Sequence, residues 1–252
     1  MTTVTLPSPE ALAAASSVFT FALVGISAVV AGSAVAAALW VRSLNAWALG
    51  GVSFVLSQTA QVATLFLLGP LVGALVNAPL QEFSRTLILA TAARRVRGEP
   101  AGAAFGLGHG AIDILTSALL PTLSAVVILG GIRDGSIFIG LAPEATERVN
   151  AVGVYLASQG IISAALLIVQ VSLMLAVHVM LTLLVLRVVA RGGERREIVR
   201  GVLLPTAIHL PVAVVRVLFP SVTTPVLLVA LVGAVLVYRR GTNAMTETPP
   251  TQ

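Results

Sequence analysis

The sequence contains no cysteine and no lysine, and it is poor in charged residues of either sign. Without cysteine, disulfide bonds, thiolate metal ligands and cysteine nucleophiles are excluded, so any metal ion must be bound by histidine and carboxylate. Only 10% of the 252 residues are charged, whereas a soluble domain carries about 25%. With 57% hydrophobic residues and a mean hydropathy of +1.01, the composition predicts an integral membrane protein.

All 15 basic residues are arginine, and most of them follow long apolar segments. This placement is typical of the loops of a membrane protein, so the net charge of +5 indicates topology and no nucleic-acid partner. The N-terminal MTTVTLPSPE lacks the basic region of a signal peptide. We therefore expect the lipid bilayer to surround most of the chain.

The apolar segments predict an all-α fold, a polytopic transmembrane helix bundle of about seven spans, since about 20 apolar residues cross a bilayer. Arginine clusters occupy every second loop, which predicts an external N-terminus, a cytosolic C-terminus and an external segment 131–150. We expect one integral membrane domain over 1–252, multi-pass in the cell membrane, with a functional core at about 50–220 and a polar tail at 241–252. The predicted spans are 18–41, 51–78, 80–96, 101–130, 157–190, 198–218 and 222–238.

Six ionisable side chains lie inside these apolar spans, where a charge at mid-helix costs about 2.5–3.5 kcal/mol. At a helical rise of 1.5 Å per residue, all of them fall roughly 10–18 Å inside the boundary marked by the arginine loops. Such residues mark a functional site by default. The six are Glu82, Arg85, His109, Asp113, His178 and His209.

Each of these residues also has a purely structural explanation. A lone histidine in a membrane helix is more often an interhelical hydrogen-bonding partner than a ligand. Glu82 and Arg85 at i,i+3 form an ion pair in the simplest case, and Asp113 fixes a histidine tautomer. Arg216 is expected to reach the membrane interface. The glycines around His109 serve either helix packing or access of substrate and water to the imidazole.

Two motifs in this region resemble those of a known family. QEFSR at 81–85 is similar to the EExxR motif of the YhfC-type membrane proteins, and FGLGHGAID at 105–113 is similar to their FGxGHGxxE motif. The pair Glu147-Arg148, the helix that carries His178, and IHLPVAVV around His209 resemble later family motifs. The YhfC-type proteins are related to PrsW and to the CAAX prenyl protease and bacteriocin-processing superfamily.

This resemblance implies an enzyme, an intramembrane metalloprotease that cleaves a membrane-embedded peptide or protein. It implies a divalent metal, with zinc expected, bound by His109, His178 and His209. Glu82 is then the general base, Arg85 positions it or a substrate carbonyl, and His109 and Asp113 complete the catalytic set. The sequence departs from the family pattern at Gln81, Asp113 and Ala213, which replace the first paired glutamate, a glutamate and a polar residue respectively.

The alternative is a non-enzymatic membrane protein, either a transporter or a degenerate pseudoprotease. Buried carboxylates and histidines also suit a proton relay, and Gln81 is consistent with a lost active site. Geometry separates the two hypotheses, because a metallopeptidase needs its histidines to converge on one point, whereas a conduit distributes them along a path.

Overall fold

The computed structural model describes residues 6–91, 96, 98–190 and 195–246. The described residues are helical with no strand among them, which confirms the predicted all-α class. The chain divides into two compact units, unit 1 at 1–29 and 114–171 and unit 2 at 30–113 and 172–252. The expectation of a single integral domain over the whole chain stays a prediction.

Six described helical segments are long and apolar enough to cross a membrane, which confirms a multi-pass membrane protein. They come from α1 (Pro9–Leu39), the first half of α2 (Leu44–Ala90), α3 (Glu99–Ile114) continued by α4 (Leu120–Asp134), α6 (Ile161–Ala190), α7 (Arg195–Leu218) and α8 (Thr223–Thr246). The second half of α2 corresponds to the third predicted span, 80–96, and is not among the six.

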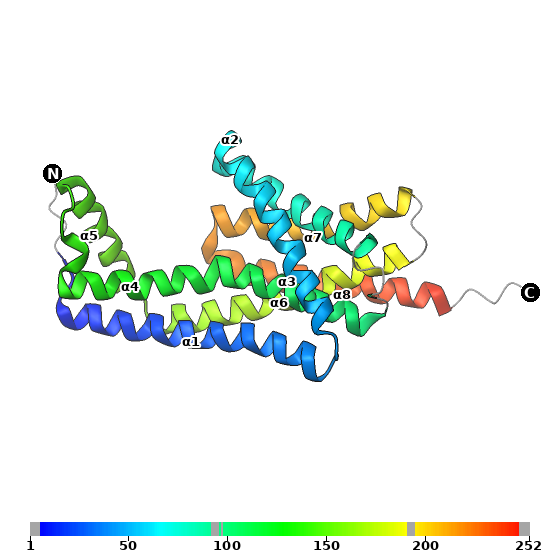
Figure 1. Cartoon of the computed structure of the whole chain (residues 1–252), viewed down its shortest axis with the longest axis horizontal. Coiled ribbons are helices and arrows are strands. Elements are labelled where there is room, and N and C mark those ends of the chain that lie inside the picture. The colour runs from blue at the N-terminus through cyan, green and yellow to red at the C-terminus, as the bar shows by residue number, and fades with distance from the viewer. Residues whose placement is uncertain (1–5, 92–95, 97, 191–194, 247–252) are drawn as a thin grey trace, which may run out of the picture. The chain divides into compact units, whose positions relative to one another are not determined.

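The two halves of α2 form a hairpin (Figure 1). Gly69 has φ 83° and ψ 173°, a conformation that favours glycine, and this residue breaks the helix. Sixteen residues before this break and fifteen after it, Ser53 Oγ and Ser84 Oγ lie 3.5 Å apart, so the two halves are in contact well away from the turn. The predicted boundary at Pro79 is wrong by ten residues. Pro79 continues the second half, since bundle neighbours make proline tolerable inside a membrane helix.

The predicted fourth span is one long helical segment with a π-helical turn, Leu115–Leu119, between α3 and α4. The turn ends before Pro121, which has no backbone N–H to offer, and it begins directly after the segment that carries Asp113. Such π-turns are frequent at functional sites. The predicted end at Gly130-Gly131 is four residues short, since α4 runs to Asp134 and ends at Gly135 in the left-handed region with φ 77°.

Unit 1 contains the segment predicted as an external loop. There the short helix Ser136–Phe138 and α5 (Pro143–Ala157) follow α4. The core of this unit combines residues of α1, α4 and α5, and Gly153 of α5 lies directly over Ile132. The external position of this segment, the external N-terminus and the cytosolic C-terminus stay predictions. Of the arginines that support them, Arg94, Arg95, Arg97 and Arg191 lie outside the described residues.

In unit 2, glycines allow α3 to pack closely between α2 and α6. A Cβ on Gly108 would overlap the backbone oxygen of Trp47, and one on Gly106 would lie 2.6 Å from Cα of Val179. A Cβ on Gly110 would lie 2.9 Å from Cδ1 of Leu175 on α6. Helix packing therefore accounts for the glycines around His109, and this packing fixes the position of the imidazole between two helices.

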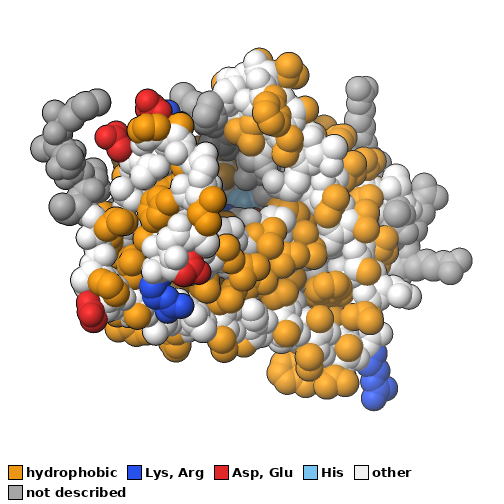
Figure 2. Space-filling model, turned by 60° about the vertical axis from the view of Figure 1, so that its left-hand side comes forward, with side chains coloured by type: hydrophobic (Ala, Val, Ile, Leu, Met, Phe, Trp, Pro, Cys, Tyr) orange, Lys and Arg blue, Asp and Glu red, His pale blue; other side chains and the backbone are white. Residues whose placement is uncertain are grey.

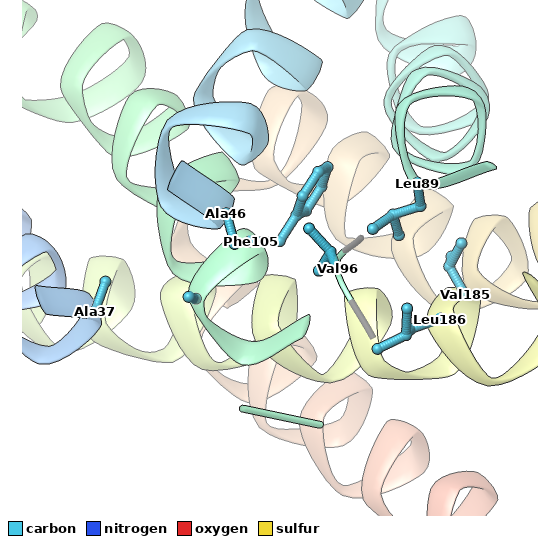
Figure 3. Packing of buried hydrophobic residues seen from close by; sticks show 8 residues of the cluster. Ala37, Ala46, Leu89, Val96, Phe105, Val185 and Leu186 are labelled. Carbon is cyan, nitrogen blue, oxygen red and sulfur yellow. The ribbon is translucent and has the colours of Figure 1, made fainter. Parts of the chain in front are cut away.

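A hydrophobic cluster lies one to two turns from the predicted site residues on three helices (Figure 3). Leu89 follows Arg85 by four residues, Phe105 precedes His109 by four, and Val185 follows His178 by seven. Ala37, Ala46, Val96, Ala104 and Leu186 complete it. Closely packed apolar side chains leave little room for water, so the cluster covers this end of the site with apolar groups.

Candidate functional site

The six predicted site residues come together in unit 2 from four helices. Glu82 and Arg85 lie on the second half of α2, and His109 and Asp113 lie one turn apart on α3. The last two, His178 and His209, lie on α6 and α7. All six side chains are buried, so none lies on an exposed face of its helix.

Five of these residues and Arg216 form one continuous chain of polar contacts. Arg85 Nη1 donates to Glu82 Oε2 at 2.5 Å and its Nη2 donates to Nδ1 of His178 at 2.9 Å. Nε2 of His178 lies 2.9 Å from Oδ2 of Asp113. The other oxygen of Asp113, Oδ1, lies 3.8 Å from Nη1 of Arg216. At the opposite end, Glu82 Oε1 lies 2.9 Å from Nδ1 of His209.

The carboxylates determine which nitrogen of each imidazole carries a proton. A carboxylate accepts hydrogen bonds, so Nδ1 of His209 and Nε2 of His178 are the donors. Nδ1 of His178 is then the acceptor for Arg85. With two arginines and two carboxylates in the chain, neutral histidines leave the network with no net charge, which is the arrangement that burial favours.

His109 belongs to a second, uncharged network. Its Nε2 lies 3.2 Å from Gln81 Oε1, and its Nδ1 lies 3.2 Å from Ser53 Oγ. Gln81 in turn donates its amide to Asn77 Oδ1 at 3.0 Å. The amide oxygen of Gln81 can only accept, so Nε2 of His109 donates and Nδ1 accepts from Ser53. Both ring nitrogens of His109 are therefore bound by this protein.

The three imidazoles are neighbours, with His178 in the middle. Its ring centroid lies 5.0 Å from that of His109 and 5.3 Å from that of His209. His109 and His178 have no exposed surface, whereas His209 is 5% exposed. A small area of histidine surface is visible in Figure 2. Asp113 is also 5% exposed, so His209 is the one imidazole of the site with exposed surface, and it is not the one exposed member of the network.

Sequence reasoning missed several members of these networks. Arg216 was expected at the membrane interface, which stays a prediction, and its contact with Asp113 at 3.8 Å was not foreseen; 33% of its side chain is exposed. The available signal was its position seven residues after His209, on the same face of α7. Ser53 and Asn77 carry no charge and belong to no motif, and Ser84 stands at an unspecified position of the motif at 81–85, so nothing in the sequence distinguished them from other polar residues of a helix.

The remaining motif residues lie elsewhere or have no polar role. Glu147 and Arg148 are exposed on α5 in unit 1. Ala213 is buried on α7, four residues after His209, and its methyl group offers no hydrogen bond. Gln81 lies well inside the second half of α2, so it does not cap a helix that begins after Pro79.

Comparison with known proteins identifies a family. The family model described as YhfC intramembrane metalloprotease matches residues 15–232, a range that contains every site residue. A search of curated proteins and a search of solved structures each found no match. The relation to PrsW and to the CAAX prenyl proteases stays a prediction.

A metalloprotease family implies a divalent metal ion, and the side chains present are of the right chemical kind. Imidazole nitrogens and carboxylate oxygens bind zinc, and carboxylates orient two of the three histidines as they do around metal sites. Their arrangement does not fit a metal, because protein groups occupy both nitrogens of His109 and of His178. Among the described residues, no group of three histidine, aspartate or glutamate side chains is arranged to hold a metal ion.

Proposed function

We propose that this chain, which belongs to the YhfC intramembrane metalloprotease family, hydrolyses a peptide bond of a membrane-embedded peptide or protein, with Glu82 and His209 activating the water. The observation that carries the proposal is the contact of 2.9 Å between Glu82 Oε1 and Nδ1 of His209. A carboxylate that accepts from one imidazole nitrogen leaves the other nitrogen as a base.

Nε2 of His209 is the group best suited to take the proton of water. Within the described part of the chain it has no hydrogen-bond partner, and His209 is the one histidine of the three with exposed surface. Glu82 has no exposed surface, and both of its oxygens are already bound. The sequence predicted Glu82 as the direct base, whereas these contacts favour a role through His209.

The reaction then follows from this pair. His209 Nε2 removes a proton from water as the water oxygen attacks the peptide carbonyl carbon. The imidazolium returns that proton to the leaving nitrogen, so the products are a carboxylic acid and an amine. Glu82 stabilises the imidazolium while it exists, because its carboxylate is fixed against the protonated ring.

The other predicted catalytic residues support this pair. Arg85 holds the second oxygen of Glu82, which fixes the direction of the carboxylate toward His209. His178 holds Arg85 from the other side, and Asp113 holds His178 in turn. His109 anchors Gln81 on the turn of α2 that precedes Glu82. The predicted binding of a metal, zinc in particular, by His109, His178 and His209 stays a prediction, and no step above uses it.

The test replaces His209 by glycine and adds imidazole to protein in liposomes that contain a membrane peptide substrate. We expect the His209→Gly variant to lose about 10²–10⁴-fold in rate, the usual contribution of a positioned acid–base group. Imidazole should restore part of that loss, since His209 is the one histidine of the three with any exposed surface, 5%. The His109→Gly variant is the control, because its position is fully buried.

Two outcomes contradict this assignment. Either His209→Gly keeps the wild-type rate, or imidazole rescues the His109→Gly variant as well as the His209→Gly variant. Should the glycine variants not fold, His209→Gln retains the size of the side chain and removes the base. It must then lose activity while its melting temperature stays near that of the wild type.

The second candidate is a non-enzymatic membrane protein, a degenerate protease or a transporter. The closed arrangement around Glu82 favours it, since Arg85 neutralises that carboxylate and Gln81 replaces a family glutamate. The clustering of the three imidazole rings favours one reaction centre over a conduit. An inactive wild type in which Glu82→Gln lowers only the melting temperature would establish the degenerate protease.

A further inference from the structure

Arg85 is a fully buried cation that binds groups which a metal ion would otherwise use. Its guanidinium has no exposed surface, and it contacts Glu82 through Nη1 and His178 through Nη2. Its Nε is buried without a hydrogen-bond partner among the described residues. The cation is therefore held by one carboxylate oxygen and one imidazole nitrogen, ligand types that zinc also takes.

A divalent ion at this position has two obstacles. The lone pair of His178 Nδ1 already accepts a hydrogen bond from Arg85, and its other nitrogen is bound by Asp113. The guanidinium itself repels a second cation, and this repulsion is strong in a buried site where water screens little.

We propose that the Arg85 guanidinium is the resident cation of this site and competes with a divalent metal ion for Glu82 and His178. The family name implies a metal ion, whereas the histidines are not arranged to bind one. The guanidinium of Arg85 explains this difference, because it already occupies Glu82 and His178. The inference rests on the proposed function in treating Glu82 as part of the active site. Its experiment measures metal binding and not hydrolysis, so the two proposals fail separately.

The experiment titrates Zn²⁺ into the purified full-length protein in detergent and measures the dissociation constant calorimetrically. Arg85→Met removes the charge and retains an unbranched side chain that follows the first part of the arginine stem. We expect it to bind one Zn²⁺ about tenfold or more tightly than the wild type, because the competing charge is gone. Arg85→Lys keeps the charge and should bind zinc no better than the wild type.

Arg216→Met is the matched control, since it removes an equal charge from the same network at Asp113 and leaves Arg85 in place. Equal tightening in Arg216→Met and Arg85→Met would overturn the proposal, because the effect would then be general electrostatics. Wild-type protein that binds one Zn²⁺ as tightly as Arg85→Met would overturn it too. Should Arg85→Met not fold, the wild type still decides, since submicromolar binding of one zinc ion contradicts a resident Arg85.

Discussion

The Glu82→Gln variant is expected to hydrolyse a membrane peptide about 10²–10⁴-fold more slowly than the wild type. Glutamine keeps the shape of the side chain, but a neutral amide no longer stabilises the imidazolium of His209, and its amide nitrogen cannot accept the Nδ1 proton. The measurement is the initial rate of cleavage in liposomes, together with the melting temperature of each protein.

Glu99→Gln is the matched control for that variant. Glu99 is an acid in the first turn of α3 that binds Arg187 and Tyr238, outside the networks of the site. Its replacement should leave the rate within about threefold of the wild type, since surface charges contribute little. Full activity of Glu82→Gln would show that Glu82 takes no part in the reaction, whatever the remaining variants do.

The Gln81→Glu variant, which restores the family residue, is expected to raise the rate. A carboxylate at position 81 still accepts the proton of His109 Nε2, as the amide oxygen does at 3.2 Å. Asn77 accepts from Gln81 at 3.0 Å and can rotate its amide to donate instead. The change adds a proton-accepting group beside Glu82, and such a group contributes up to about 10²–10⁴-fold when it is positioned.

Gln159→Glu makes the same chemical change outside the site and should leave the rate unaltered. An unchanged rate for Gln81→Glu, in a protein with an unchanged melting temperature, would show that the amide already provides all that position 81 contributes. A lower rate would indicate that the buried network does not tolerate a third carboxylate. Either result would remove Gln81 from the list of functionally important departures from the family.

Counting residues from the arginine-rich loops predicted one shared layer for Glu82, Arg85, His109, Asp113, His178 and His209, because a helix has a fixed rise. The six side chains do come together, and their depth in the membrane stays a prediction. The partners did not follow, because contact depends also on how each helix is rotated about its axis. Thus the sequence offered no means of knowing that Arg85 lies against His178, or that Arg216 reaches Asp113.

The elements of the fold were predictable to different degrees. Long apolar helices follow from composition, and the family motifs identified α2 and α3 as the elements that carry the site. The hairpin turn did not, because proline disfavours a helix interior both at Gly69-Pro70 and at Pro79, and the structure has the break at Gly69. The π-turn at Leu115–Leu119 has no sequence signature beyond the proline that follows it.

The central claim is that this chain hydrolyses peptide bonds with the Glu82–His209 pair. In the most direct measurement, liposomes made with ¹⁸O-labelled water contain either the wild-type protein or the Glu82→Gln variant, together with a set of membrane-spanning peptides. The products are then analysed by mass spectrometry. The account predicts cleaved peptides that carry ¹⁸O at the new carboxyl terminus with the wild type only. Labelled product at equal yield from both proteins, or no product from the wild type and from Gln81→Glu, would contradict it.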